Sequence, residues 1–428
     1  MLFRSKYSDR GMTTRVSSNL VSVAGSKSIA NRALICAALA KSESIVSNCA
    51  PGDDTEAMID ALQTLGVGIE RKTDSIQVVG NLDLEATHEL QLNAKLAGTT
   101  SRFLTALCSL RAGATTIDGD ATLRVRPMHD LHKALRDLGA RVTPVENDGY
   151  LPVRVSRGTQ WQAKVAVSAS MSSQFTSGLM MIAPYLPSGL EITLSEEVVS
   201  RGYIEMTVGV MRAFGVNTDF SGNQIWVSPG EYQGTSFSVE PDASSASYPL
   251  GAVAISGGSV TIEGLSRSSL QGDVEFVDLL ARMGCNVSES PEGLKLSRQK
   301  EKPLRGIEVN MSQISDCVPT LAVVALFAET PTRISGIGFI RNKESDRIGD
   351  LIGELRKLGA NVSETADGMV IAPGALHGAT LETHHDHRLA MAFALIQHEV
   401  DGVVVNNPEV VSKSWPNYFD VLHTFYIS

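Results

Sequence analysis

Two cations stand beside small hydroxyl residues where an apolar helix is expected to begin. Residues 25–32 read GSKSIANR, which places Lys27 and Arg32 on the first turns of that helix. A helix N-terminus carries unpaired N–H groups and a partial positive charge, so cations are locally unfavourable there. Lys27 and Arg32 therefore indicate an anionic ligand with more than one negative charge, bound at the helix N-terminus.

Three further helix openings are polar but differ in what they offer a ligand. Residues 96–102 (LAGTTSR) place Gly98 where the backbone can approach a ligand closely, and Arg126 follows the next expected strand. Residues 172–174 (SSQ) carry three uncharged hydrogen-bonding side chains, which suit a sugar-like ring or a phosphate. Residues 242–248 (DASSASY) contain no cation and fit a plain helix cap at least as well as a ligand site.

Charged residues concentrate in the C-terminal part of the chain. Residues 343–347 read KESDR, residues 386–388 read DHR, and Lys413 follows. A run such as KESDR, taken alone, also fits a solvated helix face. The histidine cluster at residues 384–387 has neither cysteine partners nor an HExxH spacing, so no metal site is predicted. The chain also lacks GxxxxGK[ST] and GxGxxG motifs, which disfavours a P-loop kinase or a dinucleotide-dependent dehydrogenase.

An internal repeat organises these groups along the chain. Six polar helix openings lie 70 to 74 residues apart, beginning at Ser26, Gly98, Ser172, Ser244, Asp316 and Asp386. Five glycines that follow a Leu/Met-x-x-apolar pattern interleave with them and are expected to cap helix C-termini: Gly66, Gly139, Gly215, Gly284 and Gly359. The 428 residues therefore divide into six copies of one unit, each with two helices and about four strands. Residues 239–242 (VEPD) are the expected boundary between two lobes of three units.

Composition limits the class of protein and its partners. With 43% hydrophobic and 20% charged residues, the chain is neither disordered nor a coiled coil. A formal net charge of −10 disfavours binding to nucleic acid or to an anionic membrane, which leaves small molecules as partners. Five scattered cysteines predict no disulfide framework and fit a reducing cytoplasm. Residues 1–17 lack the apolar stretch of a secretory signal and are expected to form a disordered leader.

Nine of these segments, in this order and at this spacing, closely resemble the 5-enolpyruvylshikimate-3-phosphate synthase family from about Leu20 onward. They are residues 25–32, 97–102, 126–127, 172–174, the pair Ser200 and Tyr203, residues 242–248, 343–347, 386–388 and Lys413. The resemblance implies an α/β fold, a two-lobed inside-out α/β barrel of six βαββ-type repeats with three βαβαββ units per lobe. It also implies a first lobe at residues 21–240 and a second lobe at residues 1–20 plus 241–428.

The resemblance implies transfer of the enolpyruvyl group of phosphoenolpyruvate to the 5-hydroxyl of shikimate 3-phosphate, in aromatic amino-acid biosynthesis, by a cytoplasmic monomer that needs no metal or cofactor. Its implied catalytic residues are Asp316 as base toward the 5-hydroxyl, Glu344 for proton transfer at C3, and Lys27. The residues it implies for shikimate 3-phosphate are Lys27, Ser28, Arg32, Ser172, Ser173, Gln174, Ser200, Tyr203, Asp316 and Lys343. Those it implies for phosphoenolpyruvate are Lys27, Gly98, Arg126, Gln174, Arg347, Arg388 and Lys413.

Three positions depart from the family pattern. Leu96 stands where an asparagine is usual, Phe103 where a proline is common, and Phe339 where some members have an asparagine that binds the shikimate phosphate. Phe339 is expected to weaken one contact by about 1 kcal/mol if nothing replaces it. Leu96 and Phe103 are expected to alter the floor of the phosphoenolpyruvate pocket around Gly98.

Two alternatives remain from the sequence. The sister family transfers enolpyruvyl to UDP-N-acetylglucosamine and typically carries a reactive cysteine six residues before the proline of its Arg-Pro motif; Ala121 stands at that position. A catalytically inactive binding module on the same fold would be expected to lack Asp316 or Glu344, and both are present.

Overall fold

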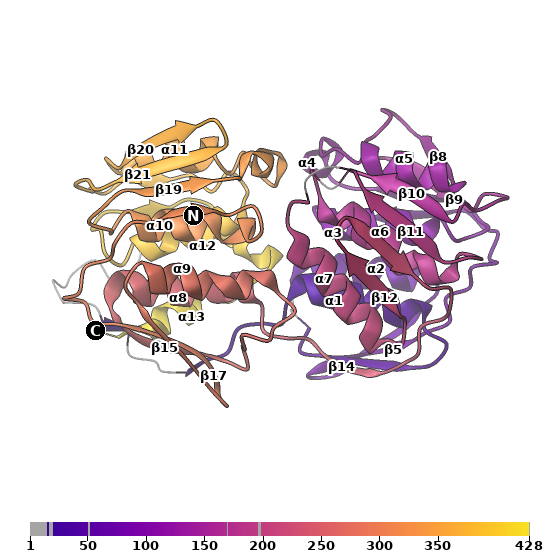
Figure 1. The fold of residues 1–428 in the computed structure, drawn as a ribbon, viewed down its shortest axis with the longest axis horizontal. Helices are drawn as coiled ribbons and strands as arrows, with labels where there is room; N and C mark the ends of the chain where they lie inside the picture. The colour runs from indigo at the N-terminus through magenta and orange to yellow at the C-terminus, as the bar shows by residue number, and fades with distance from the viewer. Residues whose placement is uncertain (1–14, 17–19, 50–51, 169, 196–197, 428) are drawn as a thin grey trace.

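The computed structural model describes residues 15–16, 20–49, 52–168, 170–195 and 198–427. The chain forms two lobes that lie side by side, with segments of chain crossing between them (Figure 1). Each lobe has its own hydrophobic core. The core of the first lobe takes residues from Ile29 to Val239, and the core of the second takes Val21, Val23 and residues from Ala243 to Leu422.

The first lobe contains three units, each with a four-stranded sheet. Across each sheet, an edge strand pairs in parallel with its neighbour. That neighbour then pairs with an antiparallel hairpin, which forms the other half of the sheet. The elements of the first unit are α1 (Lys27–Leu39), β3 (Ser44–Ser47), α2 (Asp53–Thr64), β4 (Gly68–Arg71) and β5 (Ser75–Val79). Those of the second are β6 (Leu90–Asn93), α3 (Gly98–Cys108), β7 (Thr115–Asp118), α4 (Ala121–Arg124), α5 (His129–Leu138), β8 (Arg141–Pro144) and β9 (Val153–Ser156). Those of the third are β10 (Lys164–Val167), α6 (Ser173–Ile182), η1 (Ala183–Tyr185), β11 (Leu190–Leu194), α7 (Arg201–Ala213), β12 (Thr218–Ser221) and β13 (Gln224–Val227).

The second lobe repeats this arrangement twice and then departs from it. Its first unit contains α8 (Ala243–Ser256), β15 (Gly258–Glu263), η2 (Gly272–Glu275), α9 (Phe276–Arg282), β16 (Asn286–Ser290) and β17 (Gly293–Arg298). Its second contains β18 (Glu308–Asn310), η3 (Ser315–Cys317), α10 (Val318–Ala325), β19 (Thr332–Ser335), η4 (Gly338–Asn342), α11 (Gly349–Lys357), β20 (Asn361–Thr365) and β21 (Gly368–Ala372). Its third contains β22 (Thr380–Leu381), α12 (His387–Ile396), β23 (Val404–Val405), η5 (Pro408–Lys413), α13 (Tyr418–Phe425) and β24 (Tyr426–Ile427). In this last unit β22 and β23 form a two-stranded sheet, while β24 pairs with β1 (Arg15–Val16).

Two short strands pair with strands that lie far away in the sequence. Strand β14 (Ser236–Ser238) precedes the second lobe in sequence but pairs with β3 in the first unit. Strand β2 (Leu20–Val21) precedes the first helix of the first lobe but pairs with β15 in the second lobe. The chain therefore enters the first lobe only after Val23, slightly later than the expected boundary before residue 21.

The described N-terminal residues join the same sheet of the second lobe as β2. Strand β1 pairs with both β15 and β24, so Arg15 and Val16 belong to a sheet of the second lobe. The expectation of a disordered leader is wrong for these two residues. The rest of that expected leader, residues 1–14 and 17, lies outside the described residues.

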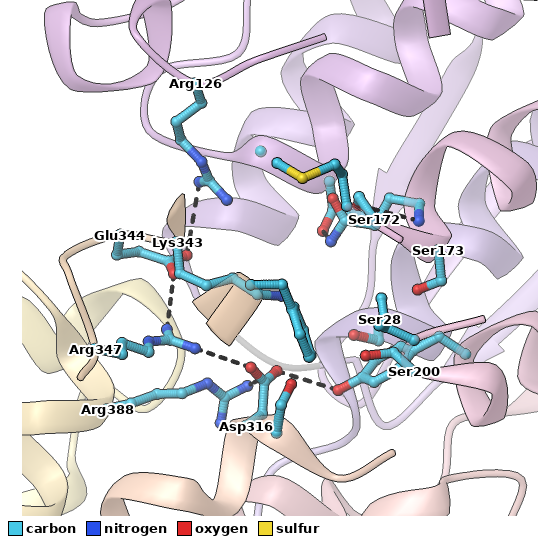
Figure 2. A pocket seen from close by; sticks show the side chains of 18 of the residues that line it. Ser28, Arg126, Ser172, Ser173, Ser200, Asp316, Lys343, Glu344, Arg347 and Arg388 are labelled. Atoms are coloured by element: carbon cyan, nitrogen blue, oxygen red, sulfur yellow. Dashed lines mark hydrogen bonds and ion pairs between the residues drawn. The ribbon is translucent and has the colours of Figure 1, made fainter. Parts of the chain in front are cut away.

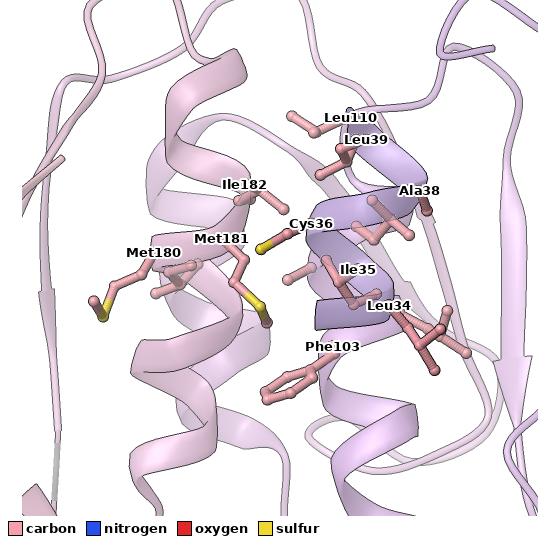
Figure 3. Packing of buried hydrophobic residues seen from close by; sticks show 14 of the residues in the cluster. Leu34, Ile35, Cys36, Ala38, Leu39, Phe103, Leu110, Met180, Met181 and Ile182 are labelled. Atoms are coloured by element: carbon pink, nitrogen blue, oxygen red, sulfur yellow. The ribbon is translucent and has the colours of Figure 1, made fainter. Parts of the chain in front are cut away.

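Three helices are buried at the centre of each lobe. Helices α1, α3 and α6 pack against one another in the first lobe, and α8, α10 and α12 do so in the second. Every residue of α8 is buried, because its sequence places small or apolar residues on all sides. Figure 3 shows Leu34, Cys36, Phe103 and Met181 packed between helices of the first lobe. These helices can therefore bring their N-termini together at one end of each lobe while their sides stay dry.

The repeat predicted from the glycine series is confirmed at the helix C-termini. All five glycines have positive φ, from 80° at Gly359 to 111° at Gly284. A side chain is strained in that conformation, so glycine ends each helix and turns the chain toward the next strand.

Candidate active site

A cavity of about 700 Å³, partly open to solvent, lies between the lobes (Figure 2). The starts of α1, α3 and α6 reach it from the first lobe, and η3 with the start of α12 reach it from the second. Each helix N-terminus presents backbone N–H groups and the positive end of a dipole. The converging N-termini therefore suit a ligand with several negative charges.

The helix caps show which N-termini are left for a ligand. Ser172 accepts a hydrogen bond from the N–H of Gln174 at 3.3 Å, and Asp386 accepts one from the N–H of Arg388 at 2.9 Å. The residues at the same position before α1 and α3, Ser26 and Ala97, form no side-chain cap. The first turns of α1 and α3 are therefore not closed by a side chain of their own cap residue.

Five cations and three carboxylates line the cavity. They are Lys27, Arg126, Lys343, Arg347 and Arg388, with Asp54, Asp316 and Glu344. On the first-lobe side, the Nζ of Lys27 lies 2.8 Å from the Oδ2 of Asp54. Across the lobes, the Nη1 of Arg126 lies 3.8 Å from the Oε1 of Glu344. The cavity lining therefore carries more positive than negative charges, which favours binding of an anion.

Arg347 is the centre of the charge network on the second-lobe side. Its guanidinium is buried and donates to the carboxylates of Asp386 at 2.7 Å, Asp316 at 2.9 Å and Glu344 at 2.7 Å. Arg388 donates to the other oxygen of Asp316 at 2.7 Å. These charge-assisted bonds hold the two carboxylates that line the cavity, Asp316 and Glu344, in fixed orientations.

The cations around Asp316 and Glu344 favour the ionised form of both carboxyl groups. Burial alone would raise the pKa of Asp316, but Arg388, Lys343 and Arg347 outweigh it and hold that pKa below its ordinary value. Burial would likewise raise the pKa of Glu344, but Lys413 and Arg347 hold it well below the ordinary value. Both groups are consequently weak bases until something reduces the positive potential around them.

Lys343 is the least satisfied of the lining cations. Among the residues that the structure describes it makes no ion pair, and its Nζ lies 5.9 Å from the centre of the Phe339 ring. Burial lowers its pKa, and the nearby Asp316 only partly offsets that effect. Phe339, which stands at a departure from the family pattern, lines the cavity beside it. An anion bound here would relieve the desolvation of Lys343 directly.

The lobes touch around the cavity. The N–H of Ser200 donates to the backbone carbonyl of Ser312 at 3.1 Å, and the N–H of Arg201 donates to the Oε1 of Gln313 at 2.8 Å. At the opposite side, the Nζ of Lys413 lies 3.4 Å from the backbone carbonyl of Leu96. The cavity is thus closed on two sides by direct contacts between lobes.

The structure brings most of the sequence-predicted site residues into one place. Those that line the cavity are Lys27, Ser28, Gly98, Arg126, Ser172, Ser173, Gln174, Ser200, Tyr203, Asp316, Lys343, Glu344, Arg347 and Arg388. Lys413 lies behind this lining, where its Nζ donates to the Oε1 of Glu344 at 3.0 Å.

Arg32 departs from the expected direct contact with a ligand. It lies one helical turn after Ser28 and points into the core, where its guanidinium donates to the hydroxyls of Thr207 at 2.7 Å and Ser177 at 3.0 Å. It also donates to the backbone carbonyl of Ser28 at 2.7 Å. Burial lowers the pKa of Arg32 to about 10. Arg32 therefore supports the first turn of α1 and is not part of the cavity lining.

Several lining residues were missed by the sequence analysis. Asp54 pairs with Lys27. It was missed because Asp53 and Asp54 begin α2, where acidic residues are common since they interact favourably with the positive end of the helix dipole. Thr99 accepts a hydrogen bond from the Nε2 of Gln174 at 2.9 Å and thereby orients that amide. His387 sits inside the DHR segment but carried no separate signal. Only the three-dimensional arrangement of the units brings these side chains to the cleft.

The described residues contain neither a metal-binding group of side chains nor a helix that could span a membrane. The Nε2 of His384 lies 2.8 Å from the Oε1 of Glu354, a buried residue of α11 that does not line the cavity. Across the described ranges, no group of three histidine, cysteine or acidic side chains could hold a metal ion. Over the same ranges, none of the helices has the length and apolar character needed to cross a membrane.

Comparison with known proteins places the chain in a family. The model of the EPSP synthase (3-phosphoshikimate 1-carboxyvinyltransferase) family matches residues 12–422. A 3-phosphoshikimate 1-carboxyvinyltransferase of Nostoc punctiforme is 38% identical over 403 residues, which cover 93% of this chain and 94% of that protein. One of Methanosphaerula palustris is 40% identical over 402 residues, with the same coverage of both chains.

A solved structure agrees with the sequence comparison. The EPSP synthase of Acinetobacter baumannii superimposes with a TM-score of 0.80 at 26% identity, over 97% of this chain and 98% of that one. The two-lobed inside-out α/β architecture expected from the sequence is thereby confirmed. With converging helix N-termini, a cationic cavity and a family match along nearly its whole length, the chain belongs to the EPSP synthase family of 3-phosphoshikimate 1-carboxyvinyltransferases.

Proposed function

We propose that the cavity between the lobes transfers the enolpyruvyl group of phosphoenolpyruvate to the 5-hydroxyl of shikimate 3-phosphate and releases phosphate. The observation that carries this proposal is the pair of ionised carboxylates, Asp316 and Glu344, held by Arg347 in a cavity with excess positive charge. A reaction between two anions needs the cations, and its proton transfers need the carboxylates.

The two substrates divide the cavity between them. Shikimate 3-phosphate fits the side rich in hydroxyl groups, where Ser172, Ser173 and Ser200 can donate to its phosphate and Lys343 can neutralise it. Phosphoenolpyruvate fits the side where Arg126 and the second-lobe arginines face the uncapped start of α3. Lys27 lies at the start of α1, where it can serve both substrates.

The remaining binding roles follow the same division. For shikimate 3-phosphate they fall to Ser28, Gln174, Tyr203 and Asp316, and for phosphoenolpyruvate to Gly98, Gln174, Arg347, Arg388 and Lys413. Arg32 supports the shikimate side from behind, through its hydrogen bonds to the backbone carbonyls of Ser28 and Tyr203.

The proposed chemistry assigns proton transfer at C3 to Glu344 and the proton of the 5-hydroxyl to Asp316. Glu344, which takes up a proton as substrate binding raises its pKa, delivers that proton to C3 of phosphoenolpyruvate and makes C2 electrophilic, while Asp316 accepts the proton of the 5-hydroxyl as its oxygen attacks C2. The tetrahedral intermediate then loses phosphate, which takes the proton held by Asp316, as Glu344 recovers a proton from C3 and the enol ether is complete. The guanidinium and ammonium groups stabilise the phosphate as it leaves.

Substrate binding is expected to raise the low pKa values of Asp316 and Glu344. The cations that hold the pKa values of Asp316 and Glu344 down would turn toward the phosphates and the carboxylate of the substrates. Each carboxyl group then faces less positive potential, and its pKa rises toward the range useful for proton transfer. The site is therefore expected to become competent for proton transfer only when both anions are bound.

We also propose that the protein acts in the cytoplasm as a monomer, without a metal or cofactor. Each of the five cysteines is a free thiol, which suits a reducing compartment. Both walls of the cavity come from one chain, so a second copy is not needed to complete the site.

Release of phosphate from phosphoenolpyruvate, measured with each acceptor in turn, tests the proposed function. Turnover with shikimate 3-phosphate and not with UDP-N-acetylglucosamine supports it. The reverse preference would favour the sister reaction, although Ala121 occupies the position of that family's reactive cysteine. Binding of both substrates without phosphate release would identify an inactive binding module.

Arg126→Lys is expected to weaken phosphoenolpyruvate binding by about 1.5–3 kcal/mol, the range for a hydrogen bond to a charged group. A planar guanidinium can hold two oxygens of a carboxylate or phosphate at once, and an ammonium cannot. The measurement is the KM for phosphoenolpyruvate at saturating shikimate 3-phosphate. Arg124→Lys is the matched control, since Arg124 pairs with Asp118 at the surface. An unchanged KM in Arg126→Lys would place this arginine outside the binding site.

Gly98→Ala is expected to raise the KM for phosphoenolpyruvate about tenfold, with a smaller effect on shikimate 3-phosphate. A Cβ at this position would lie 2.8 Å from the Nη1 of Arg126, so the guanidinium must move away from the start of α3. The same kinetics on Gly353→Ala provide the control, because a Cβ on Gly353 meets nothing within 4 Å. Equal effects on both substrates would argue against a specific role of Gly98 in the phosphoenolpyruvate pocket.

A further inference from the structure

A second, smaller cavity of about 210 Å³, also partly open to solvent, shares a wall with the first. Ser28 and Tyr203 line both cavities. On its second-lobe side it is lined by Asp273, which is 3% exposed, and by Ser244 from the start of α8. Tyr203 thus stands between the proposed reaction site and a buried aspartate to which the proposed function assigns no role.

The hydroxyl of Tyr203 links the carboxyl group of Asp316, which lines the reaction cavity, to that of the buried Asp273. It lies 3.1 Å from the Oδ2 of Asp316 and 3.4 Å from the Oδ2 of Asp273. Figure 2 shows Asp316 with one interaction toward Arg347 and another toward the opposite wall of the cavity. A phenol carries a single proton, so it can donate to one of these carboxyl groups only.

The surroundings of the two aspartates differ sharply. Asp316 is paired with Arg347 at 2.9 Å and Arg388 at 2.7 Å. Asp273 receives a hydrogen bond from the hydroxyl of Ser244, but no cation pairs with it in the described part of the chain, and its Oδ1 is buried without a hydrogen-bond partner there. A buried carboxylate without a cation is strongly unfavourable, whereas a neutral carboxylic acid is tolerated.

One arrangement of protons gives the Tyr203 hydroxyl both a donor and an acceptor. Burial, with Asp273 and Asp316 nearby, raises the pKa of Tyr203 well above its ordinary value, so the phenol keeps its proton. If Asp273 carries a proton, it donates to the oxygen of Tyr203, and Tyr203 donates to Asp316. If Asp273 were ionised, the oxygen of Tyr203 would face a second anionic oxygen with no proton between them.

We propose that Asp273 is a neutral positioning residue, whose carboxylic acid fixes the Tyr203 hydroxyl as a hydrogen-bond donor to Asp316. The inference rests on the proposed role of Asp316 as the base toward the 5-hydroxyl. Asp273 touches neither substrate; it acts through Tyr203. Its effect is to hold the phenol in one orientation, so that Asp316 keeps one lone pair directed into the cavity.

The charged groups around Asp273 agree with a neutral acid. Asp316 and Asp242 add negative potential, Cys317 is buried beside it, and Arg388 is turned toward Asp316. Burial, followed by the charge of Asp316, raises the pKa of Asp273 to about 7. As the pH rises through this value Asp273 loses its proton and Tyr203 loses its fixed orientation. We therefore expect kcat to fall as the pH rises through about 7, whereas the contribution of Asp273 to stability falls between its unfolded pKa of 3.8 and its folded pKa of about 7 and changes little above that.

The test combines infrared spectroscopy with kinetics on the full-length enzyme. Asp273→Asn keeps the size and a neutral donor, while Asp273→Leu keeps the approximate size and removes all hydrogen bonding. Glu354→Gln is the control, since Glu354 is a buried carboxylate of the same lobe that pairs with Lys357 and His384 outside both cavities. The infrared measurement records the carbonyl stretch of protonated carboxyl groups between about pH 6 and pH 8.5, a window in which ordinary carboxyl groups do not titrate.

The proposal predicts that the wild type and Glu354→Gln lose one such band as the pH rises and that Asp273→Asn lacks it. Asp273→Asn should keep kcat within about threefold of wild type and lose the alkaline fall of kcat near pH 7. Asp273→Leu should lower kcat about tenfold or more, with both KM values within about threefold. A band retained in Asp273→Asn, or full activity in Asp273→Leu, would overturn the proposal. If the wild type itself fails to release phosphate, the proposed function is wrong, and the infrared result still decides whether Asp273 holds a proton.

Discussion

Glu344→Gln and Asp316→Asn are each expected to lower kcat by about 10²–10⁴-fold, the usual contribution of general acid–base catalysis. Both amides keep the size of the side chain but can neither accept nor deliver a proton at neutral pH. Both carboxylates are held by Arg347, at 2.7 Å for Glu344 and 2.9 Å for Asp316, so each variant loses one ionic partner of a guanidinium that keeps two others. The loss should therefore appear in kcat more than in either KM.

Steady-state kinetics with both substrates varied provide the measurement. Asp346→Asn is the matched control, because Asp346 lies two residues after Glu344 but pairs with Arg341 outside the cavity. Its kcat should stay within about threefold of wild type. Near-wild-type kcat in both Glu344→Gln and Asp316→Asn would remove these carboxyl groups from the mechanism.

The repeat could be predicted from the sequence because its signals are local. A glycine that ends a helix in the left-handed conformation is needed wherever the chain turns toward the next strand, so Gly139 and Gly284 mark their helices in the sequence itself. The distant pairings of β2 and β14 could not be predicted in the same way. Each is a strand of two or three residues, and its partner lies more than 190 residues away. Short strands carry too little pattern to specify such a distant register.

The candidate site shows the same limit. The cations at the helix openings could be predicted because they contradict the ordinary preferences of a helix N-terminus, as Lys27 does. Asp54 obeys those preferences and was missed, although it holds Lys27 at 2.8 Å. Arg32 was predicted to contact the ligand. Its side chain instead hydrogen-bonds in the core, because this residue, one turn into α1, faces α6 and α7. Asp273 lies in a stretch of sequence with no visible signal, and only the fold brings it to Tyr203.

Arg347→Met is expected to lower the free energy of unfolding by about 3–5 kcal/mol, the cost of removing one partner from a buried ionic cluster. Arg347 is 1% exposed and bonds to Asp386, Asp316 and Glu344 at once. Without it these carboxylates face one another with too few cations, and the second-lobe wall of the cavity loses its fixed geometry. Urea-induced unfolding, followed by fluorescence, measures the change at neutral pH.

The pH dependence of this loss distinguishes an ionic cause from simple loss of packing. Arg347 helps to hold the pKa values of Asp316 and Glu344 below their ordinary 3.8 and 4.5, so its contribution is present above those values and is lost as the pH falls and the carboxylates take up protons. The difference in stability between wild type and Arg347→Met should therefore be largest near neutral pH and should shrink below about pH 4. Arg341→Met, which breaks the more exposed pair with Asp346, should cost no more than about 1 kcal/mol at any pH. A loss in Arg347→Met that stays constant as the carboxylates protonate would mean that Arg347 stabilises this lobe by packing, and that its charge is free for the substrates.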